Sequence, residues 1–172
     1  MIQSPPRTIV EVFESLPEGT LCQVINNELV MSPAPSSKHQ KVVRDIAFEL
    51  YSFVKKHSLG EVLFAPVDVY LDEENVYQPD IVFISNQQIH ILQEKINGAP
   101  DLIVEILSPG SDKYDKKEKK AVYERSGVKE YWMVDPHTKN TTGYRLQGEH
   151  YLEMSAGEGM IQPMLLQTTI QF

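Results

Sequence analysis

The sequence predicts a mixed α/β fold, in which a β-sheet is flanked by helices. Three observations favour this class: two segments have helical periodicity, several short apolar runs end at turn residues, and the two kinds of element are interspersed along the chain. With 172 residues the chain can bury about two thirds of its unfolded surface in one core. We therefore expect a single domain spanning residues 1–172.

A short helix and a β-hairpin are expected first. Residues 8–16 place apolar side chains at helical spacing, and Pro17 ends the pattern. Residues 21–25 and 28–31 are strand-like and flank two asparagines, 26–27, which tolerate positive φ and suit a two-residue hairpin turn.

A long helix is predicted next. Either Ser36 or Ser37 can cap its N-terminus, and Gly60 is expected to end it. Its residues at steps of three or four form one stripe, most of it apolar: His39, Val43, Ile46, Leu50, Phe53 and His57.

The rest of the chain is rich in predicted strands. A helix containing residues 115–126 is expected between the last two of the apolar strands, and it closes at Gly127. From residue 141 onward we expect edge strands or hairpins. The strands predicted before that point are residues 61–64, 67–71, 81–84, 101–107 and 130–135, and Pro79-Asp80 lies at the start of the third of them.

Composition excludes several functional classes. The net charge is −8, from 16 Lys and Arg against 24 Asp and Glu, which argues against a protein that coats nucleic acid through bulk positive charge. The sequence shows neither a leader peptide nor an apolar run long enough to span a bilayer, so we expect a soluble, cytoplasmic protein without membrane contact. The single cysteine, Cys22, is expected to be an inert structural thiol.

Two apolar strands each carry one carboxylate, Asp80 at the start of one and Glu105 near the end of the other. If the strands are neighbours, the carboxylates converge, and their repulsion must be relieved. A hard divalent cation such as Mg²⁺, which binds one or two protein carboxylates, would relieve it. Alternatively, Asp80 accepts hydrogen bonds from turn amides and Glu105 pairs with a lysine.

Several motifs together resemble a known family. They are Pro79-Asp80, Glu105 within VEILSP, a helix with Asp115, Lys119 and Tyr123, and GVKEYWMVDP at residues 127–136, with ELVMSP at 28–33, His39 and Tyr144-Arg145-Leu146 as further matches. The set resembles the Uma-type restriction endonuclease family, which belongs to the PD-(D/E)XK nuclease superfamily. The resemblance covers roughly residues 20–155.

This resemblance implies a restriction-endonuclease-like core with additional N-terminal and C-terminal β-hairpins. It also implies a metal-dependent endonuclease that acts on nucleic acid, with DNA as the expected substrate. Asp80, Glu105 and the main-chain carbonyl of Ile106 would hold one Mg²⁺ or Mn²⁺ ion. The superfamily places a lysine two residues after the second acid, where this chain has Leu107.

The family pattern puts the missing lysine at Lys119, which shares a helix face with Asp115 and Tyr123. The alternative is that Lys119 forms an ordinary surface ion pair with Asp115. His39 could reach the carboxylates as a supporting group or proton shuttle, or could be a partly buried structural residue. We expect the aromatic side chains of Tyr123, Tyr131 and Trp132 to pack in the core.

Two other functions stay open at this point. Leu107 and the acidic charge balance favour a non-catalytic nucleic-acid-binding or protein-binding module on the same fold. A metal-dependent hydrolase of a small phosphoester is the other. An open sheet edge in the C-terminal strands would allow a homodimer.

Overall fold

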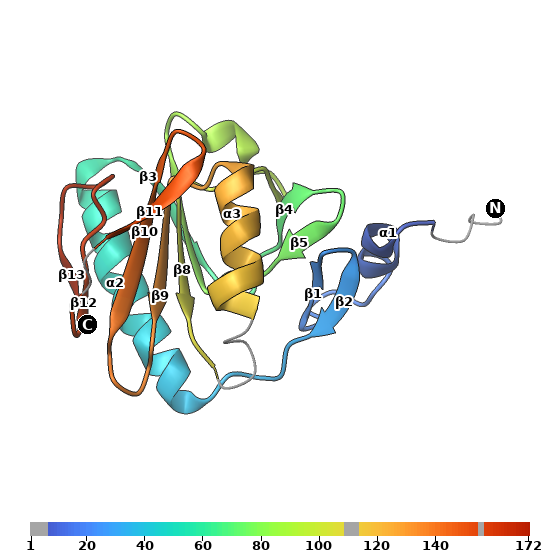
Figure 1. The fold of residues 1–172 in the computed structure, drawn as a ribbon, viewed down its shortest axis with the longest axis horizontal. Helices are drawn as coiled ribbons and strands as arrows, with labels where there is room; N and C mark the ends of the chain where they lie inside the picture. The colour runs from blue at the N-terminus through green and yellow to red at the C-terminus, as the bar shows by residue number, and fades with distance from the viewer. Residues whose placement is uncertain (1–6, 109–113, 155–156) are drawn as a thin grey trace.

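The computed structural model describes residues 7–108, 114–154 and 157–172 and contains a central six-stranded mixed sheet. Helices cover its two faces, and a smaller five-stranded sheet lies to one side of it (Figure 1). The prediction of a mixed sheet flanked by helices is confirmed. In spatial order the six strands are β11 (His150–Met154), β10 (Thr141–Gln147), β9 (Glu130–Val134), β8 (Leu102–Ile106), β6 (Ile81–Ser85) and β3 (Gly60–Phe64).

Within this sheet only the central pair β8–β9 is parallel, and the other neighbours are antiparallel. The middle strands β6, β8 and β9 are almost entirely buried, as their near-continuous apolar sequences require. Strand β11 pairs only with β10 among the described residues and forms one edge of the sheet. The C-terminal hairpin predicted after residue 141 is therefore β10–β11.

The second sheet carries the N-terminal hairpin. Asn26 and Asn27 both adopt positive φ, at 49° and 61°, and this confirms the predicted turn. Together with helix α1 (Ile9–Glu14), this hairpin extends to one side of the main body (Figure 1). In spatial order the strands of the second sheet are β2 (Glu28–Met31), β1 (Cys22–Ile25), β5 (Asn75–Tyr77), β4 (Val69–Asp72) and β7 (Ile96–Asn97).

Helix α2 (Ser37–His57) packs on one face of the six-stranded sheet, and helix α3 (Lys120–Ser126) packs on the other. Ser36 caps α2 by accepting a hydrogen bond from the His39 amide. Alternation along β8 sends Val104 and Ile106 into the core under α2, and sends Ile103 into the core under α3. A π-helical turn, η2 (Tyr114–Lys119), leads into α3. The remaining elements are a 3₁₀ turn, η1 (Ile89–Ile91), and the pair β12 (Met160–Ile161) and β13 (Ile170–Gln171).

The prediction that Gly60 ends the long helix was wrong. Helix α2 is capped by Ser58, which adopts the left-handed conformation with φ 51°, and Gly60 is the first residue of β3. A side chain at Gly60 would place its Cβ 2.0 Å from the carbonyl oxygen of Ile84, so the neighbouring strand requires glycine there. The buried strand predicted at residues 81–84 is confirmed as β6, and β5, which ends at Tyr77, belongs to the other sheet.

Cys22 is fully buried, and burial followed by the charge of Asp68 raises its thiol pKa. These surroundings fit an inert structural thiol. Within the described part of the chain, no helix combines the length and the apolar character needed to cross a membrane.

Candidate active site

Asp80 and Glu105 come together because their strands are neighbours. Strands β6 and β8 are antiparallel, and Ile81 pairs with Val104. The residue before Ile81 and the residue after Val104 therefore lie at the same end of the sheet. This register brings the two carboxylates predicted from sequence to one place.

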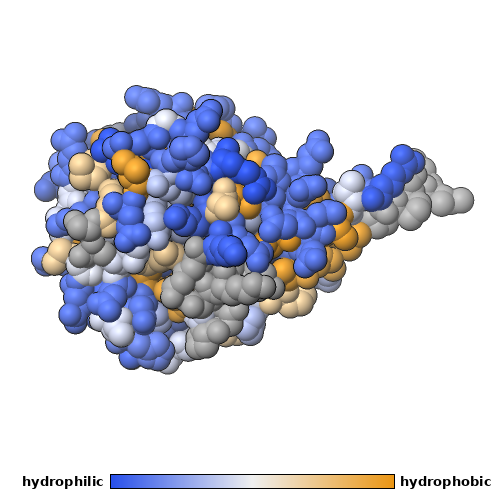
Figure 2. All heavy atoms as spheres, viewed as in Figure 1, coloured by the Kyte–Doolittle hydropathy of each residue, from blue (hydrophilic) through white to orange (hydrophobic). Residues whose placement is uncertain are grey.

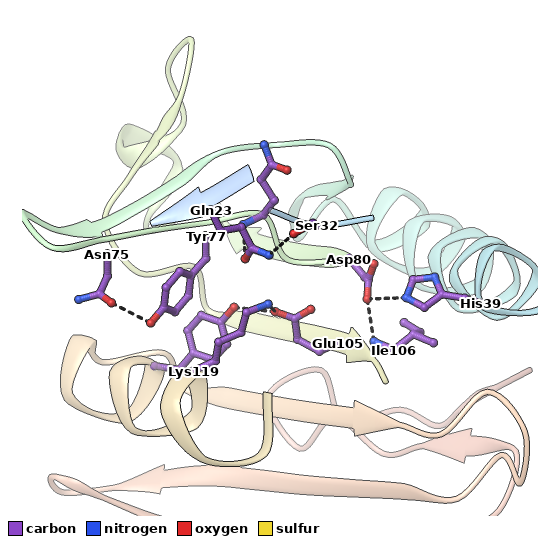
Figure 3. Close-up of polar contacts among 11 residues, drawn as sticks. Gln23, Ser32, His39, Asn75, Tyr77, Asp80, Glu105, Ile106 and Lys119 are labelled. Atoms are coloured by element: carbon purple, nitrogen blue, oxygen red, sulfur yellow. Dashed lines mark hydrogen bonds and ion pairs between the residues drawn. The ribbon is translucent and has the colours of Figure 1, made fainter. Parts of the chain in front are cut away.

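Asp80 lies in the short connection between the two sheets and is held by the end of β8. Its Oδ2 accepts a hydrogen bond of 2.8 Å from the main-chain amide of Ile106, the residue after Glu105 (Figure 3). The same oxygen lies 3.3 Å from Nε2 of His39. The expected partner of Asp80, a turn amide, is replaced by an amide from the adjacent strand.

His39 is buried near the N-terminus of α2, on the stripe that faces the sheet. Burial lowers its pKa, but the hydrogen bond and the charge of Asp80, helped by the backbone of Ile106 and the charge of Glu105, outweigh burial. The net effect raises the pKa of His39 above its ordinary value. Its Nδ1 is buried and has no hydrogen-bond partner within the described residues. The contact with Asp80 thus favours the protonated form of His39.

Glu105 is 3% exposed and is held by the helical segment that covers its face of the sheet. Alternation along β8 places Glu105 on the same face as Ile103, under α3. Nζ of Lys119 lies 2.9 Å from Oε1 of Glu105, and the hydroxyl of Tyr123 donates to the same oxygen at 2.8 Å. Lys119 is itself 3% exposed, so this ion pair is buried.

The lysine therefore reaches the second acid from the helix, while Leu107 is a partly buried core residue. Leu107 lies two residues after Glu105 and shares its face of the sheet, which is also the face that Lys119 approaches. Nζ of Lys119 also lies 5.7 Å from the ring centre of Tyr77. The alternative pairing with Asp115 concerns a side chain outside the described residues, and the described partner of Lys119 is Glu105.

Tyr123 has a polar role that sequence reasoning missed. Its ring is fully buried and packs against Tyr77 and Tyr131 at centre distances of 5.5 and 5.0 Å, so the expected core packing is present. Burial first, and then the charge of Glu105, raises its pKa well above the ordinary value, which keeps the hydroxyl a donor. The spacing of four residues from Lys119 was the available signal.

One cavity of about 750 Å³ between the two sheets is lined by Asp80, Glu105, Lys119 and His39, among other residues. The β1–β2 hairpin contributes Gln23. Its side-chain Nε2 donates to the hydroxyl of Ser32 at 3.0 Å (Figure 3), and its Oε1 accepts a hydrogen bond of 3.0 Å from the main-chain amide of Gln78. Sequence reasoning did not find Gln23 or Gln78, because neither belongs to a recognisable motif. The polar lining residues are Gln23, Ser32, Ser36, His39, Gln40, Gln78, Asp80, Glu105, Ser108, Lys119 and His137.

The structure thus brings Asp80, Glu105, Ile106, Lys119 and His39 into one cavity. Within the described ranges, no group of three or more His, Cys, Asp or Glu side chains is arranged to hold a metal ion. The oxygen donors that a cation could use are the two carboxylates and the carbonyl of Ile106.

Comparison with known proteins identifies the family and the fold. The model of the Uma2 family, described as "Putative restriction endonuclease", matches residues 10–172. The fold resembles a crystal structure described as "a putative nuclease belonging to DUF820" from Anabaena variabilis, with a TM-score of 0.76 and 20% identity over 94% of this chain and 92% of that one. No curated protein matches the sequence. The family match spans nearly the whole chain, and we conclude that this protein belongs to the Uma2 family.

Proposed function

We propose that this protein is a metal-dependent nuclease that hydrolyses phosphodiester bonds in nucleic acid, with DNA as the expected substrate. The observation that carries the proposal is the meeting of Asp80 and Glu105 at one end of β6 and β8, with Lys119 on Glu105, inside a cavity. Membership of a family described as restriction endonucleases supports the same chemistry.

The donor set fits Mg²⁺ or Mn²⁺. Asp80, Glu105 and the Ile106 carbonyl offer hard oxygen ligands, and Mg²⁺ usually takes one or two carboxylates and keeps several waters. The need for water ligands agrees with the two acidic side chains, Asp80 and Glu105, among the described lining residues. When bound, the ion would supply Lewis-acid activation of water and offset negative charge on the phosphate.

The chain's own residues would share the remaining work. Lys119 would orient the attacking water and offset charge on the phosphate, in place of the lysine that is absent at position 107. His39 would fix the carboxylate of Asp80 and could pass a proton, since Asp80 raises the pKa of the imidazole above its ordinary value. The hydroxyl of Tyr123 would hold Oε1 of Glu105.

One observation favours a second candidate, a non-catalytic binding module on the same fold. Oε1 of Glu105 already accepts hydrogen bonds from both Lys119 and Tyr123, so the protein itself satisfies this oxygen. Together with Leu107, this arrangement would suit a site that no longer binds metal. Metal binding therefore separates the two functions.

The test is a calorimetric titration with Mn²⁺, followed by cleavage assays on plasmid DNA. Wild type should bind Mn²⁺ and cleave in its presence, whereas Asp80→Ala should lose both. Asp45→Ala, which removes a carboxylate on α2 outside this cavity, serves as the control and should behave as wild type. No binding by wild type at millimolar Mn²⁺ would favour the module, and equal cleavage by Asp80→Ala would remove the assignment.

Two further features belong to this proposal. A homodimer could form through the edge strand β11, whose outer side has no partner strand within the described residues. Light scattering coupled to gel filtration measures this directly, and a monomer at all concentrations would exclude it. A cytoplasmic location also stays a prediction.

A further inference from the structure

The cavity that holds the candidate active site has two chemically different walls. One wall carries Asp80, Glu105 and Lys119, and the opposite wall is formed by the β1–β2 hairpin and the segment after it. Figure 3 shows Gln23 and Ser32 of the hairpin on the other side of the site from Glu105 and Lys119.

The hairpin wall is largely apolar, and the strand pattern explains why. In β1, Cys22 and Val24 pack into a small core with α1, so the alternate residues Leu21, Gln23 and Ile25 face the cavity. Val30 and residues 33–35, which are Pro-Ala-Pro, extend the apolar lining. Hydrophobic side chains also gather on the surface over the hairpin and α1 (Figure 2).

The size and depth of the cavity limit what can enter it. Its volume of about 750 Å³ lies within the range of small-molecule pockets, about 300 to 1,000 Å³. Glu105 and Lys119 are each only 3% exposed, so a phosphate must enter the cavity to approach them. A regular duplex is stiff and presents its phosphates on a convex surface, whereas a single unpaired nucleotide can enter a pocket.

The charge of the lining residues also favours an unpaired nucleotide over a regular duplex. Among the described lining residues there is one lysine and no arginine, and that lysine is buried against Glu105. Proteins that follow a duplex backbone make many Lys and Arg contacts to phosphates. An unpaired base instead offers apolar faces, which pack on apolar side chains, and a polar edge, which a polar lining side chain such as Gln40 can contact.

We infer that the substrate is a nucleic-acid strand with an unpaired nucleotide, whose base packs against the Leu21–Ile25–Val30 wall while its phosphate reaches Asp80 and Glu105. The inference deepens the proposed function and rests on it for the phosphate end of the site. The apolar wall is an independent feature, and its contribution to binding is measurable without catalysis.

The hairpin supplies a matched pair of variants. Leu21 is 37% exposed and lines the cavity, whereas Leu29 is 38% exposed on the same hairpin and is outside the lining. Leu21→Glu and Leu29→Glu therefore add the same charge at nearly the same exposure. A difference between them reports on the cavity wall and not on overall electrostatics.

Binding is measured by fluorescence anisotropy in EDTA and separately in Ca²⁺, using a single strand, its perfect duplex, the duplex with one mismatch, and a mononucleotide. We expect the single strand and the mismatched duplex to bind on the order of tenfold more tightly than the perfect duplex. Leu21→Glu should lower the affinity for the single strand on the order of tenfold. Leu29→Glu should match wild type. Circular dichroism confirms that both variants fold.

Each of the following binding results would overturn the inference: perfect duplex binding as tightly as the single strand, equal affinities of the two variants, or no binding of any oligonucleotide. Mononucleotide binding as tight as that of the strand would also overturn it, since the site would then serve a small phosphoester. Strand binding without any metal-dependent cleavage would remove the proposed nuclease and keep the unpaired-nucleotide site. Cleavage restricted to perfect duplex would keep the nuclease and remove this inference.

Discussion

The two ends of strand β8 each carry a buried acid paired with a lysine, yet the two pairs differ in surroundings. At one end, Asp101 is fully buried, accepts the Ser85 amide at 2.7 Å, and pairs with Lys129, whose side chain is 42% exposed. At the other end, Glu105 pairs with Lys119, whose side chain is 4% exposed. Asp101 ties β6 to β8 at one end of these two strands, whereas Glu105 faces a cavity at the other end.

The difference shows that a buried carboxylate with a lysine is not by itself a functional site. Asp101 satisfies a main-chain amide that would otherwise end β6 unpaired, which is a structural task. Glu105 has a second carboxylate in the same cavity and a buried lysine, and the desolvation of these charges costs stability, so a functional role is the reason to keep them. The four predictions that follow test this contrast.

The largest expected effect separates activity from stability. Glu105→Gln should lower metal-dependent cleavage by about 100-fold to 1,000-fold or more, because it removes a proposed metal ligand and the partner of Lys119. Asp101→Asn should keep the activity of the folded protein and lower the free energy of unfolding by about 1 to 3 kcal/mol. Cleavage rates and urea unfolding measure the two effects, and equal rates for both variants would contradict the assignment of Glu105.

The two lysines should differ in stability. Lys119→Met leaves Glu105 buried without its charge partner and should cost about 3 kcal/mol, while Lys129→Met removes a half-exposed cation whose partner Asp101 keeps the Ser85 amide, and should cost less. Thermal unfolding should register the first as a fall of roughly 6 to 12 °C. Similar melting temperatures for the two variants would mean that Lys119 is better hydrated than the structure indicates.

Tyr123 tests the strength of the hydrogen bond to Glu105. Tyr123→Phe removes a donor to a charged oxygen and should cost about 1.5 to 3 kcal/mol of unfolding free energy. The control is Tyr151→Phe, which removes a buried hydroxyl bonded to the neutral carbonyl of Val128 and should cost about 1 kcal/mol. Only Tyr123→Phe should change Mn²⁺ affinity, and an unchanged affinity would restrict Tyr123 to packing.

The smallest effect concerns pH. Because the pKa of His39 is raised in the folded protein, its pairing with Asp80 stabilises the fold fully below its unfolded pKa near 6.5, and this contribution is lost as pH rises through the folded value. His39→Gln should therefore lower the free energy of unfolding by about 1 kcal/mol or less. Urea unfolding should show a larger deficit at about pH 5.5 than at about pH 9. His90→Gln, at an exposed position, is the control. A deficit that grows with pH would contradict the sign.

Much of the fold could be predicted from local pattern. The two asparagines with positive φ, the cap at Ser36 and the apolar strands β6, β8 and β9 depend mainly on neighbouring residues. The need for glycine at position 60 could not be predicted, because it depends on a strand distant in sequence. Gly60 looked like a helix stop, and contact with Ile84 is what constrains it.

For the candidate site, the sequence by itself determined which chemistry is available: two acids in apolar strands, a lysine four residues before a tyrosine, and leucine at position 107. Only the tertiary structure decided which groups meet. The antiparallel register of β6 and β8 brought Asp80 to the Ile106 amide, and packing of α3 on the sheet brought Lys119 to Glu105. Residue types and periodicity are local properties, whereas these contacts depend on strand order and layer packing, which arise only when the whole core assembles.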